Sequence, residues 1–131
     1  MVASKPQISD DLLDKDQLPQ YQCLVGCLMY LAVTTQPDIA FAAMWLGQYS
    51  SKPSQINFLA AKHVLCYLAG TSILCLSFSS STLLPTTLQG YIKIFGCADA
   101  DWASDSRDHH SISGYCSFFN GSLVSWSSVK Q

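Results

Sequence analysis

The stretch "SGYCSFFNGSLVSW", residues 113–126, gives the clearest indication of the fold. Two β-prone runs, 113–119 and 123–126, flank the dipeptide Asn120-Gly121. Asparagine and glycine tolerate the positive φ angles that both central residues of a type I′ turn require. The stretch therefore predicts a β-hairpin with a two-residue turn.

The chain before this hairpin changes from a helical to a strand-like pattern. Residues 91–99 alternate as a strand, which predicts three antiparallel strands in all. An amphipathic pattern over 21–32 predicts a first helix. Pro37 suits the first position of a second helix, Ser54 is a candidate N-cap for a third, and Gly70 is its expected stop. The apolar positions expected to face a core are Leu24, Val25, Leu28, Leu31, Ile39, Ala42, Ala43, Leu46, Tyr49, Phe58, Ala61, Leu65 and Leu68.

The expected organisation has four parts. Residues 1–20, with interspersed aspartate, lysine and proline, form an extended lead-in. Residues 21–72 form the helical segment, and 73–90 contain a short strand at 73–78 and a serine-rich linker. Residues 91–131 form the sheet. The fold class is α+β, with a sheet whose apolar face has no obvious cover.

Composition limits the possible functions. The chain has 131 residues, of which 49% are apolar and 12% charged, and its net charge is -2. No global positive field attracts nucleic acid or an anionic membrane, and no apolar run approaches the roughly 18 residues that cross a bilayer. The six cysteines form no C-x-x-C pair, and we expect a reduced, intracellular protein, cytoplasmic or nuclear.

Four blocks of sequence carry a family resemblance. They are "YQCLVGCLMYLAVTTQPDIAFA" (21–42), "AAKHVLCYLAGT" (60–71), "ADADWASD" (98–105) and "SISGYCSFFNGSLVSWSSVKQ" (111–131). In this order they closely resemble the Pol polyprotein of copia-type LTR retrotransposons. The resemblance implies a helical segment similar to the thumb and connection region of a reverse transcriptase, followed by the first three strands of an incomplete ribonuclease H-like fold.

The same resemblance gives Asp99 a role. It matches the first metal-binding carboxylate of the family's nuclease, which uses several carboxylates to hold two Mg²⁺ ions roughly 4 Å apart. The family's next ligand is a glutamate on a helix that would follow Gln131, and all nine acidic residues here are aspartates. We therefore expect a truncated copy in which Asp99 is a vestigial ligand, no catalytic site is complete, and this chain alone uses no cofactor.

Other acidic and aromatic residues have simpler interpretations. Asp101 can share the side of the strand that carries Asp99, but Asp101, Asp105 and Asp108 are typical of solvated turns or caps. Trp102 and Trp126 are expected to be packing residues.

Two pairs of possible metal ligands remain. His109 and His110 lie near Asp108, but adjacent residues in a strand point to opposite faces, which argues against a shared metal. Cys23 and Cys27, at i and i+4, could chelate a soft ion, although packing in a buried helix face is expected.

A basic helix face of the family is missing. Where relatives commonly read K-R-x-L-R-Y-L-K-G-T, this sequence has "KHVLCYLAGT" (62–71). His63, Cys66 and Ala69 lie along one side of the helix and replace three basic residues. Lys62 alone remains as a candidate nucleic-acid contact, so binding to an RNA/DNA hybrid should be weak or absent.

Three functions follow from these expectations. The first is a piece of a retrotransposon polyprotein without activity alone, whose intact parent copies RNA into DNA and cleaves RNA in RNA/DNA hybrids. The second is a captured, non-catalytic module that binds a protein partner through the uncovered sheet. The third is a split nuclease completed by another chain that supplies the glutamate helix.

Overall fold

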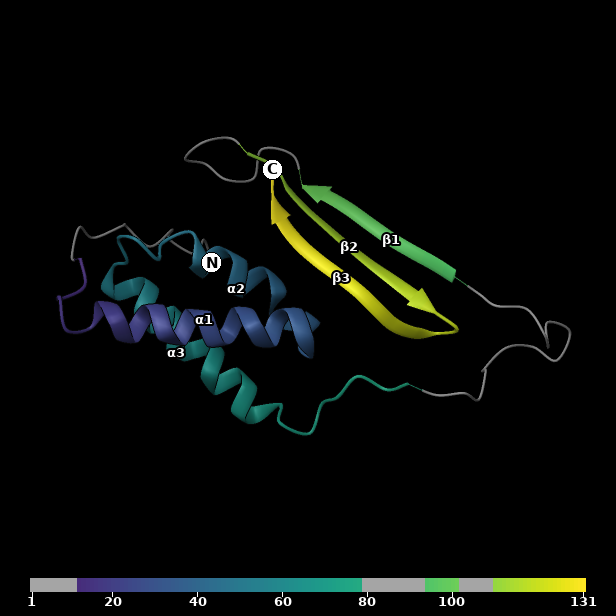
Figure 1. Cartoon of the computed structure of the whole chain (residues 1–131), viewed down its shortest axis with the longest axis horizontal. Helices are drawn as coiled ribbons and strands as arrows, with labels where there is room; N and C mark the ends of the chain where they lie inside the picture. Colours follow the sequence, from purple (N-terminus) through teal and green to yellow (C-terminus); the bar gives the residue numbers. More distant parts are fainter. Residues whose placement is uncertain (1–11, 79–93, 102–109) are drawn as a thin grey trace, which may run out of the picture.

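The computed structural model describes residues 12–78, 94–101 and 110–131. Three α-helices precede a sheet of three antiparallel strands, which confirms the α+β class (Figure 1). The helices are α1 (Leu18–Thr34), α2 (Ala40–Gly47), which follows the 3-10 turn η1 (Pro37–Ile39), and α3 (Gln55–Gly70). The strands are β1 (Ile94–Asp101), β2 (Ile112–Phe119) and β3 (Ser122–Lys130), in that order across the sheet.

The hydrophobic core belongs to the helices. Its buried residues are Tyr21, Val25, Leu28 and Ala32 of α1, Ile39, Ala43 and Leu46 of η1 and α2, and Phe58 and Ala61 of α3. Among the described residues, no strand residue is fully buried. The expected helix faces are therefore largely confirmed, but Leu65 is 43% exposed because α3 turns it away from the other helices.

The first helix begins earlier than the sequence pattern suggested. Helix α1 starts at Leu18, with Pro19 in its first turn, where a missing N–H breaks no helical hydrogen bond. Leu12 forms a β-bridge with Ser54, and the N–H of Leu13 donates to the carbonyl of Pro53 at 3.0 Å. The prediction of an extended lead-in up to residue 20 is therefore wrong for its last part.

The third helix begins as predicted, whereas the second begins three residues after Pro37, at Ala40, because residues 37–39 form a 3-10 turn. Pro37 opens η1 with Asp38 in its first turn. The Ser54 hydroxyl caps α3 by accepting from the N–H of Asn57. A tertiary contact joins the two elements, because the Tyr67 hydroxyl of α3 donates to the Asp38 carboxylate at 2.7 Å. This hydrogen bond, aided by desolvation and the carboxylate charge, raises the pKa of Tyr67 above its usual value.

The hairpin is confirmed. Asn120 and Gly121 have φ angles of 48° and 83°, and Phe119 pairs with Ser122 across them. The pairing shifts between Ser117 and Phe118, where Val124 is the extra residue of β3.

Alternation along the paired strands defines two faces. The Trp126 face carries Phe95, Cys97, Asp99, Asp101, Ile112, Gly114, Cys116, Phe118, Leu123, Trp126, Ser128 and Lys130. The Tyr115 face carries Ile94, Gly96, Ala98, Ala100, Ser113, Tyr115, Ser117, Phe119, Ser122, Ser125, Ser127 and Val129.

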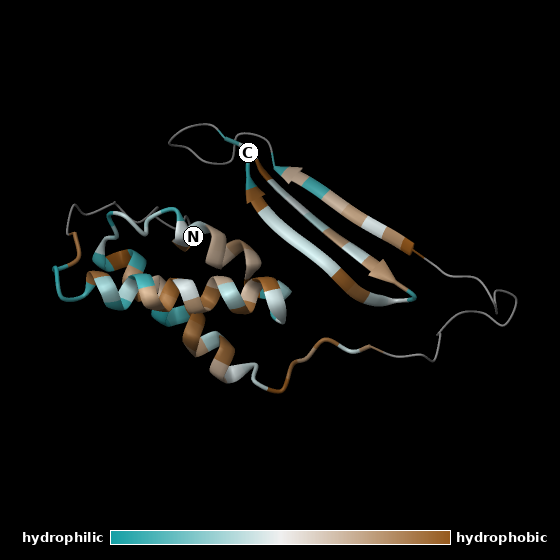
Figure 2. Ribbon diagram, in the orientation of Figure 1, coloured by the Kyte–Doolittle hydropathy of each residue, from teal (hydrophilic) through white to brown (hydrophobic). Residues whose placement is uncertain are grey.

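One predicted strand is absent. Residues 73–78 form a turn and an irregular segment after α3, which is hydrophobic in Figure 2 and includes Ile73 at 89% exposure. β-propensity reflects packing in a sheet, and a strand needs a neighbour to accept its backbone hydrogen bonds. No strand among the described residues pairs with this segment, and its β-branched and aromatic composition alone does not make it one.

Two aromatic side chains donate hydrogen bonds to carbonyls in the last turns of helices. The Tyr21 hydroxyl of α1 donates to the carbonyl of Leu46, in the last turn of α2, at 2.8 Å. The indole N–H of Trp126 in β3 donates to the carbonyl of Ala32, in the last turn of α1, at 2.6 Å. The last carbonyls of a helix have no i+4 partner within it, and both bonds supply a donor there. The Leu46 carbonyl accepts the N–H of Tyr49 as well. Strand β3 contacts α2, and the Trp126 bond fastens the sheet to the helices at this side.

Candidate functional site

The candidate ligand Asp99 lies in β1, at one edge of the sheet. It pairs with Gly114 of β2, and every residue of β1 is exposed. Asp101 is on the same Trp126 face, and its Cα lies about 6.5–7 Å away at the usual rise of a strand. The prediction that these two carboxylates share one side of an extended segment is confirmed.

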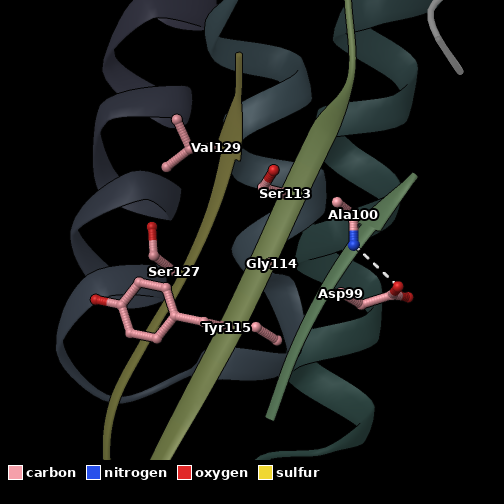
Figure 3. A pocket seen from close by; sticks show the side chains of 8 residues that line it. Asp99, Ala100, Ser113, Gly114, Tyr115, Ser127 and Val129 are labelled. Atoms are coloured by element: carbon pink, nitrogen blue, oxygen red, sulfur yellow. Dashed lines mark hydrogen bonds between the residues drawn. The ribbon is translucent and has the colours of Figure 1, made fainter. Parts of the chain in front are cut away.

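The Asp99 carboxylate accepts a hydrogen bond from the backbone of the next residue. Its Oδ1 accepts the N–H of Ala100 at 2.9 Å. Figure 3 shows the carboxylate pointing away from the other strands, toward the outer side of β1. Asp99 therefore satisfies a backbone donor of the edge strand instead of pointing toward another acidic side chain.

A shallow depression lies beside Asp99. It measures about 410 Å³ and is lined by Ala98, Asp99, Ala100, Ser113, Gly114, Tyr115, Ser127 and Val129. Most of these side chains belong to the Tyr115 face, from which the Asp99 carboxylate points away (Figure 3). Among the described residues that line the depression, Asp99 is the only acidic one.

The described residues do not form a site that could hold two Mg²⁺ ions. No group of three or more histidine, cysteine, aspartate or glutamate residues there could hold a metal ion. Two-metal hydrolysis needs several carboxylates that converge, and Asp99 and Asp101 project in series from one strand. Trp102, Asp105, Asp108 and His109 lie outside the described residues, and His110 is exposed.

The side of α3 that was expected to have lost basic residues faces solvent. His63, Cys66 and Ala69, which their spacing placed along one side of the helix, are all exposed. The Lys62 ammonium lies 4.2 Å from the centre of the Phe58 ring, an attractive cation–π contact. The candidate nucleic-acid contact therefore already has a partner within its own helix.

The expected burial of the helical cysteines is wrong. Cys23 and Cys27 are both exposed, as are Cys66, Cys75 and Cys97. The buried stripe of α1 runs through Tyr21, Val25, Leu28 and Ala32, so residues 23 and 27 fall outside it. Apolar residues lie on several sides of this part of α1, so the sequence pattern alone did not show which side faces the core.

Two contacts were not foreseen from the sequence. Trp126 was expected to pack, but its bond to Ala32 joins residues 94 positions apart, and no local pattern indicates such a pairing. Cys97 and Cys116 lie directly opposite each other on the Trp126 face. The hairpin fixes the register of β2 with β3, whereas the register of β1 depends on a longer connection that sequence spacing does not determine.

The fold and the site together define a small α+β module with an open sheet and two acidic side chains on its strand β1. Comparison with known proteins identifies its relatives. Secreted RxLR effector protein 161 of Plasmopara viticola is 42% identical over 111 residues, which cover 85% of this chain and 72% of the effector. The retrovirus-related Pol polyproteins from transposon RE2 of Arabidopsis thaliana and transposon TNT 1-94 of Nicotiana tabacum are each 38% identical over 85–86% of this chain.

The chain is therefore homologous to these proteins, over most of its own length, and two of them are copia-type retrotransposon Pol polyproteins. It spans only 7–8% of the length of the two polyproteins. No family model and no solved structure matches it. None of the described helices is long and apolar enough to cross a membrane.

Proposed function

We propose that this chain is a non-catalytic segment of a retrotransposon polyprotein, from the junction of reverse transcriptase and ribonuclease H. The main support is the position of Asp99, which lies on the first described strand of an antiparallel sheet that follows three helices. The chain that contains it is homologous to Pol polyproteins. In this proposal residues 21–72 correspond to the thumb and connection region, and 91–131 to the start of the nuclease. The intact parent would copy RNA into DNA and cleave the RNA of hybrids with Mg²⁺.

The proposed lack of activity follows from too few metal-binding carboxylates and too few phosphate-binding cations. A carboxylate pair on one exposed strand cannot surround two divalent ions, and the sequence contains no glutamate to complete the set. Phosphate affinity grows with the number of cations that contact the backbone, and Lys62 is the only cation of its helix. Six free cysteines, five of them exposed, favour a reducing compartment, cytoplasmic or nuclear.

The test is a cleavage assay on a labelled RNA/DNA hybrid with Mg²⁺. We expect the native chain to cleave no faster than the Asp99→Asn variant, since neither holds two metals. Asp16→Asn, which changes an exposed carboxylate in the helical half, is the matched control. Cleavage by the native chain and by Asp16→Asn, but not by Asp99→Asn, would contradict the proposal.

The same assay decides the split-nuclease alternative. In it, the native chain is mixed with a second chain that carries the family's glutamate helix. We expect no gain in cleavage. Mg²⁺-dependent cleavage that appears only in the mixture, and disappears with Asp99→Asn, would assign the chain a catalytic role in a two-chain enzyme.

A binding role is the second candidate, and the open sheet favours it. The Tyr115 face exposes Ile94 at 74% and Val129 at 53%, with Tyr115 and Phe119 between them. Exposed apolar side chains on adjacent strands and an unpaired edge are typical of surfaces that bind a protein. One relative is named as a secreted effector and not as a polymerase or nuclease.

This binding role predicts that the sheet binds an apolar dye such as ANS. Ile94→Lys should reduce the dye fluorescence, because it replaces the most exposed apolar side chain of this face with a charge, directly opposite Phe119. Tyr30→Lys, at a similarly exposed position on α1, is the control and should leave it largely unchanged. A native chain that binds no dye and stays monomeric at every concentration would argue against the binding role.

A further inference from the structure

Two cysteines of the sheet lie in a position to form a bond with each other. Cys97 of β1 and Cys116 of β2 are direct partners in the antiparallel register, so their side chains leave the sheet on the same Trp126 face. Both are free thiols; Cys97 is exposed and Cys116 is half-buried. No other pair of described cysteines is paired across strands.

The pairing of β1 with β2 sets the distance between the two Cα atoms. A Cβ added to Gly96 would lie 3.4 Å from the carbonyl oxygen of Cys116, so this carbonyl is directed toward β1. That orientation places the two cysteines at a hydrogen-bonded position of the ladder, where opposite Cα atoms are about 5.5 Å apart. Disulfides span Cα separations of about 4.4–6.8 Å, so the spacing of the two backbones is compatible with a bond. Opposite Cβ atoms of an antiparallel pair are about 4.5–5.5 Å apart, so a small approach of the edge strand β1 accompanies the side-chain rotation that joins the sulfurs.

We propose that Cys97 and Cys116 form a reversible redox pair, which closes to a cross-strand disulfide when the chain meets an oxidised small-molecule disulfide such as oxidised glutathione. The Cys97 thiolate attacks one glutathione sulfur, forms a mixed disulfide and releases one glutathione thiol. The Cys116 thiolate then attacks the Cys97 sulfur and releases the second. Two protein thiols are oxidised, one glutathione disulfide is reduced to two thiols, and the two thiol protons pass to the leaving thiolates.

Closing this bond changes the edge of the sheet. In the reduced chain, β1 is held by its ladder with β2, and it makes no substantial contact with the helices. The disulfide links β1 covalently to β2 next to Asp99 and fixes the register of the strand. Because Cys97 is exposed, a reductant can reach its sulfur and reopen the bond.

Competing pairs have less suitable geometry. Cys23 and Cys27 lie one helical turn apart, where Cβ atoms are about 5–6 Å from each other and the hydrogen bonds of α1 hold this spacing. A disulfide between them would distort the helix, whereas β1 is an edge strand that can shift. Cys66 lies in α3, and Cys75 lies in the irregular segment that follows it. Neither of these pairs is aligned by a strand register.

Tryptic mapping of the oxidised native chain tests the proposal directly. Trypsin cleaves after Lys93, Arg107 and Lys130, so Cys97 and Cys116 fall on different peptides, 94–107 and 108–130. After exposure to oxidised glutathione we expect a product lighter by two hydrogen atoms, with two of its six thiols lost. Its digest should contain 94–107 linked to 108–130 as the dominant disulfide product, and dithiothreitol should separate them.

The controls separate this pair from general oxidation. Cys97→Ser and Cys116→Ser should each abolish the linked peptide, whereas Cys66→Ser should leave it unchanged. In denaturant, where the strand register is lost, the preference for this pair should disappear. A different dominant pair, mainly intermolecular products, or an equal yield in denaturant would overturn the proposal.

Discussion

Replacing Tyr21 with alanine is expected to lower the free energy of unfolding by about 3–5 kcal/mol, the usual cost of removing a buried aromatic side chain. Tyr21 has no exposed surface and connects all three helices. Its ring meets that of Phe58 in α3 edge-to-face, with centroids 6.3 Å apart, and its hydroxyl bonds the Leu46 carbonyl of α2. No other core residue makes both kinds of contact among the described parts of the chain.

Tyr21→Phe separates the two contributions. It keeps the ring and removes only the hydroxyl, so we expect a loss of about 1 kcal/mol. The loss stays at this level because the Leu46 carbonyl also accepts the N–H of Tyr49 at 3.1 Å. Tyr30→Phe, on the exposed side of the same helix, should change stability by less than about 0.5 kcal/mol. Equal effects of Tyr21→Phe and Tyr30→Phe in chemical denaturation would contradict this account.

The hydroxyl also makes stability depend on alkaline pH. Desolvation by burial, with a smaller effect of Tyr49, raises the pKa of Tyr21 to about 12. The unfolded chain ionises this group near pH 10, so its contribution is fully present below pH 10 and is lost as pH rises through 12. The stability difference between the native chain and Tyr21→Phe should therefore narrow over this range. A difference that stays constant from pH 9 to 12 would show that the phenol is not protected.

Replacing Trp126 with alanine is expected to cost about 2–3 kcal/mol, less than a fully buried tryptophan because its ring is half-buried. The effect should concentrate on the sheet, since Trp126 is the hydrogen-bonded link between β3 and α1. Amide hydrogens of β2 and β3 should exchange faster, while those of the helical core change little.

Two further variants define the role of Trp126. Trp126→Phe keeps much of the apolar surface but leaves the Ala32 carbonyl without its indole donor, so we expect a loss of about 1 kcal/mol. Val124→Ala, at the exposed bulge of the same strand, should cost no more than about 0.5 kcal/mol. If Trp126→Ala leaves exchange in β2 and β3 unchanged, the sheet does not depend on this contact.

Local features were the ones that the sequence could predict. The Asn120-Gly121 turn, the Ser54 cap and the Pro37 helix start each depend on residues within a few positions, and all three are present. The position of Asp99 in a first strand beside Asp101 was likewise readable from alternation. Whether Asp99 is a former metal ligand stays a prediction.

Features set by distant partners were the ones that could not be predicted. Residues 73–78 have strand-forming composition but no strand to pair with. The buried face of α1 is centred on Tyr21 and Ala32 as much as on its leucines, because the neighbouring helices decide which side is covered. The Trp126 bond to Ala32 and the pairing of Cys97 with Cys116 both depend on how the sheet is placed, which no short pattern encodes.

The bond from Trp126 to Ala32 also bears on the order in which the chain folds during synthesis. Every buried core residue in the described part of the chain lies between Tyr21 and Ala61, so the helices can complete this core while the strands are still being made. The three described strands pair with their neighbours in sequence, and the sheet can form by adding one strand at a time. The indole bond joins residues 94 positions apart, so its docking must wait until β3 has left the ribosome.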